Sequence, residues 1–139
     1  MRISITSFMG TLGGLVVTAL GGWDASLQAL LIFMAIDYIT GIIVAGVFNR
    51  SKKSETGALN SNSGFKGIVK KGVQLFIVLI GYQLDNVLGT NFIRNCVIFA
   101  IIANELVSIM ENVGLMGIQL PPVLTKAFDI FTEKGDDKK

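Results

Sequence analysis

The chain has 139 residues, of which 51% are hydrophobic and only 16% charged, with a net charge of +2. Soluble domains average about 25% charged residues, so this composition predicts a single small helical unit in a membrane. His is absent and Cys96 is the one cysteine, which removes the commonest general base, an internal disulfide and a cysteine metal cluster. We therefore expect no enzyme activity, no cofactor and no metal. Because the chain is not basic overall, we also expect no nucleic-acid partner.

Four apolar segments follow one another and predict an all-α integral membrane protein. They cover about residues 3–22, 27–48, 68–88 and 91–110. A helix of about 20 apolar residues crosses roughly 30 Å of hydrocarbon, so residues 1–110 are expected to form a bundle of about four transmembrane helices. Alternatively the first segment lies flat, which leaves three spans. A signal peptide is a further alternative, although no small-x-small cleavage site follows.

Asp37 lies near the middle of the second segment. Placing a carboxylate at the centre of a membrane helix costs about 2.5–3.5 kcal/mol, so this side chain must face protein, water or a partner. Gly41 and Ala45 follow at four-residue spacing and share its helix face. Two interpretations stay open. Asp37 is either a buried group that bonds a neighbouring helix or a residue that lines water in an assembled pore.

Other polar or small side chains inside the spans extend the same two interpretations. Candidates for pore lining or helix packing are Gln83 in the third segment and Asn104, Glu105 and Ser108 in the fourth. For Glu105, the alternative is a position near the interface from which it reaches water. In the first segment, small residues recur every four positions, where a helix of this chain or of another copy can approach closely. This stripe contains Gly10, Gly14 and Thr18.

The connection after the second segment is polar and strongly basic. Short loops with excess Lys and Arg lie on the cytoplasmic side of membrane helices, and they attract anionic lipid head groups. The opposite turns are almost free of basic residues, so four spans put both termini in the cytoplasm. The topology and head-group candidates are Arg50, Lys52, Lys53, Lys66, Lys70 and Lys71.

Residues 111–139 are too polar to span a membrane. Apolar residues after Pro121 and Pro122 favour one side of a helix, which predicts a cytoplasmic amphipathic helix followed by a charged tail. We expect this helix to lie on the membrane surface. Packing against the bundle is the alternative.

Two sequence elements together resemble the phage-lysis and clostridial toxin-secretion holins. The first is Asp37-Tyr-Ile-Thr-Gly41, and the second is Gly64-Phe-Lys-Gly-Ile-Val-Lys-Lys71, with Ala45 and a Ser- and Gly-rich loop between them. The resemblance extends from about residue 27 to residue 108. It implies a protein of the bacterial inner membrane that accumulates and then assembles with itself into large lesions. Through these lesions a phage endolysin or a large toxin leaves the cell without being specifically bound. The resemblance implies no catalysis and no cofactor.

Two other classes of function stay open. One is a small ion or proton channel, or a transporter subunit, in which Asp37 or Glu105 carries the ion. The other is a non-conducting membrane adaptor that uses the basic loop and the tail as its interaction surface.

Overall fold

The computed structural model describes residues 4–136, and all regular structure in that range is helical. The helices are α1 (Ile5–Ala19), α2 (Ala25–Gly46), α3 (Ser61–Leu88), α4 (Ile93–Leu115) and α5 (Pro122–Asp136). Within this range α2, α3 and α4 are long and apolar enough to cross a membrane, whereas α1 is apolar but shorter. The all-α membrane fold and the additional C-terminal helix are thus as predicted. The expected start of the first span at residue 3, and residues 137–139 of the tail, lie outside the described residues.

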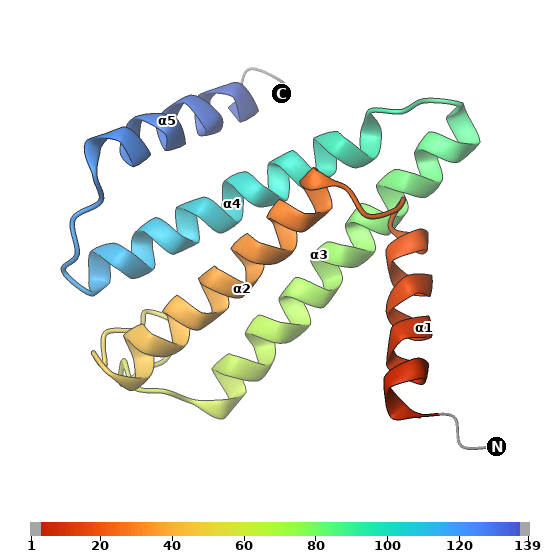
Figure 1. Ribbon diagram of the computed structural model, residues 1–139. Helices are drawn as coiled ribbons and strands as arrows, with labels where there is room; N and C mark the ends of the chain where they lie inside the picture. Colours follow the sequence, from red (N-terminus) through yellow and green to blue (C-terminus); the bar gives the residue numbers. More distant parts are fainter. Residues whose placement is uncertain (1–3, 137–139) are drawn as a thin grey trace.

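Helices α2, α3 and α4 form the body of the molecule, and α4 packs along both of the others (Figure 1). At one end of the bundle, Arg94 at the start of α4 bonds Asp24 before α2. At the other end, Arg50 after α2 donates to the carbonyl of Leu115 at the end of α4. Helices α2 and α4 therefore run in the same direction, and α3 runs opposite to both. The connection of residues 47–60 and the turn after α4 share the second end, which we call the loop end.

Local sequence explains where these helices begin and end. The Asp24 side chain accepts a hydrogen bond from Leu27 N and caps α2, and Asn60 caps α3 in the same way through Asn62 N. Gly89 ends α3 with a φ of 67°, in the left-handed region that favours glycine. Between α1 and α2, Gly21 and Gly22 have φ values of 97° and 92°, in the region that favours glycine, and form the turn between the two helices.

The core is apolar towards the Arg94 end of the bundle. Fully buried residues there are Leu27 and Leu30 of α2, Val78 of α3 and Ile98 of α4. The outer surface is also apolar, as shown by Phe76, Ile80 and Ile39, which are between 56% and 64% exposed. So much exposed apolar surface is rare on a soluble monomer and suits a bundle surrounded by lipid.

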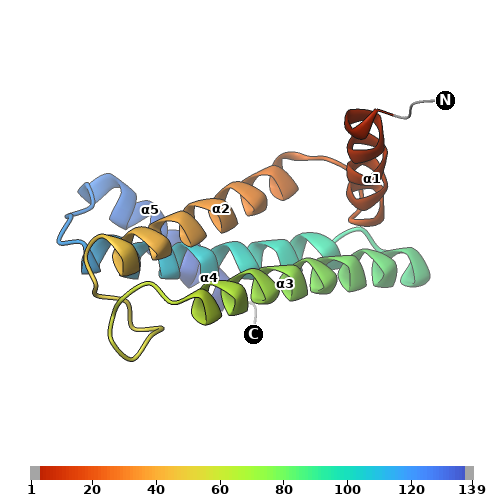
Figure 2. The same cartoon turned by 90° about the horizontal axis from the view of Figure 1, so that it is seen from below.

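Helix α1 projects away from the three central helices (Figure 2). Its 15 residues measure about 22 Å at 1.5 Å per residue, which is less than the roughly 30 Å of the hydrocarbon core. A Cβ added at Gly10 or Gly14 would meet nothing within 4 Å, and Thr18 is exposed. The small-residue stripe is therefore not packed against the second segment. Its use between copies, and the choice between three and four spans, stay predictions.

Helix α5 turns back and lies beside α4 (Figure 1), where Phe131 packs against Phe99 with ring centroids 5.6 Å apart. In the structure the amphipathic helix thus adopts the alternative arrangement, packed on the bundle. Its position on a membrane surface stays a prediction.

Candidate functional site

Three charged side chains from three different helices meet inside the bundle. The Lys71 ammonium of α3 lies 2.7 Å from Oδ2 of Asp37 on α2 and 2.6 Å from Oε2 of Glu105 on α4. The side chains of Asp37 and Glu105 are 7% and 3% exposed, and that of Lys71 is 18% exposed. We call these three residues the ion triad. An unpaired charge at this position would be very costly, and the Asp37 carboxylate reduces that cost because it pairs with the Lys71 ammonium.

The two elements that carry the family resemblance pack against each other to build this site. Tyr38, next to Asp37, donates a hydrogen bond to the carbonyl of Gly64 at 3.3 Å. A Cβ added at Gly67 would lie 3.4 Å from the Tyr38 ring, so this part of α3 passes close to Tyr38 of α2. Lys71 lies one helical turn after Gly67 on the same side. This spacing brings its ammonium to Asp37.

Asn112 extends the polar contact towards the end of α4. Its amide nitrogen donates to Oδ1 and to the backbone carbonyl of Asp37, both at 3.2 Å, and to Oγ1 of Thr40 at 2.9 Å. Asn112 is 7% exposed and therefore holds the middle of α2 to α4 from inside. The sequence analysis missed this residue. Its position seven residues after Glu105 places both residues on one helix face, and this spacing could have identified Asn112 from the sequence.

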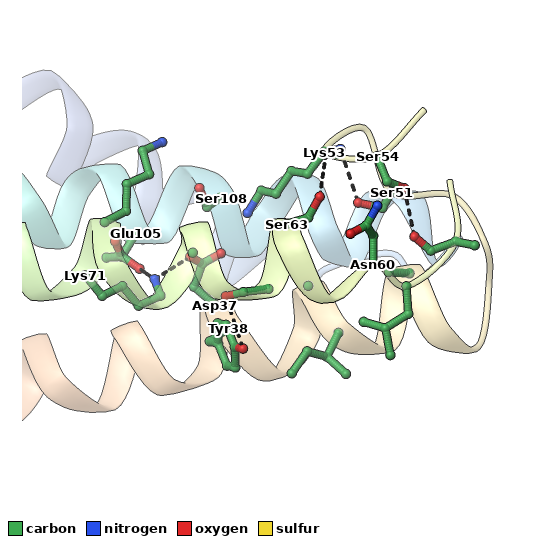
Figure 3. Close-up of a pocket in the computed structure, with 18 of the residues that line it drawn as sticks. Asp37, Tyr38, Ser51, Lys53, Ser54, Asn60, Ser63, Lys71, Glu105 and Ser108 are labelled. Atoms are coloured by element: carbon green, nitrogen blue, oxygen red, sulfur yellow. Dashed lines mark hydrogen bonds and ion pairs between the residues drawn. The ribbon is translucent and has the colours of Figure 1, made fainter. Parts of the chain in front are cut away.

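A cavity of about 140 Å³, lined by both polar and apolar residues, leads from the connection at the loop end to the ion triad. The labelled side chains from α2, α3, α4 and the connection surround it in Figure 3, and Lys53 extends into it from the connection. Gln74 also lines the cavity, and its Oε1 is buried without a protein hydrogen-bond partner among the described residues. A partly polar cavity of this size has room for water, which would satisfy such an acceptor.

The structure brings most of the predicted in-span residues to this cavity. Those that line it are Asp37, Gly41, Ala45, Asn104, Glu105 and Ser108. Gln83 does not, because it is exposed on α3 towards the opposite end. Gly10, Gly14 and Thr18 lie on α1 and are exposed. Whether the cavity residues line a pore stays a prediction.

The six basic residues predicted for topology and head-group binding divide into two groups. Five of them are exposed near the loop end: Arg50, Lys52, Lys53, Lys66 and Lys70. Lys71 differs from these five, because its ammonium is held between two carboxylates inside the bundle. Its part in topology or head-group binding stays a prediction.

A second polar cluster closes the opposite end of the bundle. Arg94 is 6% exposed, and its guanidinium donates to the carboxylate of Asp24 at 2.6 Å and to the carbonyls of Leu20 and Gly22. The Asp85 carboxylate accepts from the backbone N–H of Arg94 at 2.9 Å and so caps the start of α4. Arg94 thus pairs with Asp24 through its side chain and with Asp85 through its backbone N–H. The Arg94 hydrogen bond holds the pKa of Asp24 below its ordinary value.

The fold and this site define a small multi-span helical membrane protein with a polar interior. The model of the bacteriophage holin family matches residues 14–133. The chain is 39% identical over 140 residues to an uncharacterized protein of Listeria innocua, covering 100% of this chain and 91% of that protein. It is 29% identical over 113 residues to a probable holin of Bacillus phage phi105, covering 81% of this chain and 78% of the phage protein. No solved structure matches the chain.

The chain belongs to the bacteriophage holin family, as its sequence elements indicated. Holins are non-enzymatic proteins that act in a membrane and associate with themselves. Family membership and the three long apolar helices together indicate a multi-pass protein of the cytoplasmic membrane.

Proposed function

We propose that this protein oligomerises in the cytoplasmic membrane and forms lesions large enough to release an endolysin or a large toxin. The observation that carries the proposal is the ion triad at the cavity, enclosed in a bundle whose outer surface is apolar. In one copy these polar groups face one another. Between several copies the same faces can border water.

The balance between the two arrangements depends on concentration. Helices in lipid have no hydrophobic drive to associate, so packing and polar contacts decide which helices stay together. Contacts between copies gain from mass action as the protein accumulates, whereas contacts within one copy do not. The protein is therefore harmless while dilute and forms lesions when it becomes abundant.

We further propose that the loop end faces the cytoplasm, with both termini on that side. Arg50, Lys52, Lys53, Lys66 and Lys70 support this orientation because they gather at that end and suit anionic lipid head groups. The cargo passes without specific contacts.

A second candidate function is a narrow pathway for cations or protons. The cavity favours it, since it connects the loop end with the carboxylates of Asp37 and Glu105 inside the bundle.

Release from vesicles distinguishes the candidates. Purified protein is added at rising density to vesicles that hold a small dye and a large fluorescent dextran. We expect both to leave above a threshold density, and Asp37→Leu to shift that threshold. Release of ions alone would favour the narrow pathway and refute lesion formation. If no solute is released at any density, a non-conducting membrane adaptor is the remaining candidate function.

A further inference from the structure

Helix α5 lies beside the part of α4 that crosses the membrane. Phe99, which packs on Phe131, is 16 residues from Leu115, or about 24 Å along α4 from the loop end. The connection to α5 leaves α4 at the loop end, so the chain returns along the bundle until Phe131 meets Phe99 (Figure 1). Nine residues, or about 13 Å of helix, separate Pro122 from Phe131. The packed helix therefore lies at the depth of the hydrocarbon core.

The outward side of α5 is not suited to lipid at that depth. Lys126, Asp129 and Glu133 are exposed on it. One charged side chain in the middle of the hydrocarbon shifts the equilibrium against insertion of its helix by roughly a hundredfold. Contact between Phe131 and Phe99 does not compensate for this in lipid, where an apolar surface gains nothing from being covered.

In water the free energy of docking α5 on α4 has the opposite sign and favours the docked helix. Phe99 is 52% exposed even with α5 in place, and the hydrophobic effect favours covering such a surface. Helix α5 covers part of the apolar surface of α4 at Phe99 and leaves its own Lys126, Asp129 and Glu133 exposed. Docking of α5 on α4 is therefore stable where this side of the bundle meets water, and unstable where it meets lipid.

We infer that α5 docks on α4 in the assembled lesion and that its charged side, with Lys126, Asp129 and Glu133, forms part of the wall that faces water. In dispersed copies the same helix leaves α4 and lies on the membrane surface, and lipid covers Phe99. This inference rests on the proposed function, because it requires an aqueous lesion between copies.

Crosslinking between the two helices tests the inference. Cys96 is exposed one turn before Phe99, so the background carries Cys96→Ala. The pair Phe99→Cys and Phe131→Cys is treated with a short thiol-reactive crosslinker in two vesicle preparations, one dilute and tight, the other dense and leaking dextran. We expect at least about tenfold more crosslinking in the dense preparation, because each charge kept out of lipid contributes roughly a hundredfold.

Two controls sharpen the result. The pair Phe99→Cys and Val123→Cys keeps both helices labelled but places the thiols eight residues, or about 12 Å, further apart along α5, so it should crosslink little. Replacing two charges, Lys126→Leu with Glu133→Leu, makes the docked helix acceptable to lipid. In that background the Phe99 and Phe131 positions should also crosslink in the dilute preparation.

Equal crosslinking in both preparations of the unmodified helix, or none in vesicles that leak dextran, would overturn the inference while leaving lesion formation intact. Absence of dextran release at every density would instead refute the proposed function. Dextran release is recorded on the same vesicles, so the two failures are distinguishable.

Discussion

Lys71 offers the sharpest test of the polar interior, because the chain supplies its own control next to it. Lys71→Met keeps an unbranched side chain as far as Cε and removes the ammonium that two carboxylates share. Lys70→Met makes the same chemical change one residue earlier, on a side chain that is exposed. A rotation of about 100° per residue separates the two positions on α3.

The expected loss of stability in Lys71→Met follows from the two carboxylates that remain in the bundle without the ammonium. Removing one partner of a buried ion pair typically costs about 3–5 kcal/mol, because the remaining charge stays buried and unpaired. Asp37 keeps the Asn112 amide as a donor, whereas Glu105, with a side chain 3% exposed, loses its Lys71 bond. Since the cavity admits water, we expect the lower end of that range, about 3 kcal/mol.

Reversible unfolding in mixed detergent micelles measures this difference in the free energy of unfolding. Lys71→Met should be about 3 kcal/mol less stable than the parent chain, and Lys70→Met should change by less than about 1 kcal/mol. Adding Glu105→Gln to Lys71→Met removes the stranded charge and should recover much of the loss. If Lys71→Met and Lys70→Met are equally stable, the triad does not hold the bundle together and this reasoning is wrong.

Three further predictions concern the two ends of the bundle. The Arg94 hydrogen bond lowers the pKa of Asp24 in the folded state. The Asp24 carboxylate therefore stabilises the folded protein fully above its ordinary pKa of 3.8, and this stabilisation is lost as the pH falls through the lowered pKa. Asp24→Asn should remove this acid sensitivity from the unfolding curve. Gly81→Ala should destabilise the bundle, since its Cβ would lie 3.2 Å from Cα of Arg94, while Gly72→Ala, with nothing within 4 Å, should be neutral or slightly stabilising in the same assay. In a background without the native cysteine, Lys52→Cys should resist an impermeant thiol reagent added to intact cells, and strong labelling from outside would reverse the proposed orientation.

The long helices were predictable because hydropathy and length are strong signals in lipid. Residues 27–48 and 91–110 were expected to span, and α2 and α4 occupy Ala25–Gly46 and Ile93–Leu115. The third helix was predicted from residue 68 but begins at Ser61, because its polar first turns are helical in the structure and carry no hydropathy signal. The Asn60 cap is the local feature that indicates this earlier start.

The candidate site was only half predictable, for a related reason. Asp37 and Glu105 stand out because each interrupts an apolar run. Lys71 does not, since it ends a basic stretch and no local pattern distinguishes it from Lys70. The position of Asn112 depends on how α4 rotates against α2, and that rotation is set by packing between segments far apart in sequence.

The same triad also bears on why a small membrane bundle contains such groups. In proteins dissolved in water, replacing a buried ion cluster by apolar side chains of similar size is often neutral or stabilising. In lipid an apolar seam gains little from being covered, so polar contacts such as the triad help to hold the helices of one copy together. Under the proposed function these groups have a second role, because in a lesion each of them borders water and none has to be paired. On that proposal the closed structure is one of two arrangements of the same helices, with the apolar outer surface serving the dispersed copies and the polar interior serving the assembly.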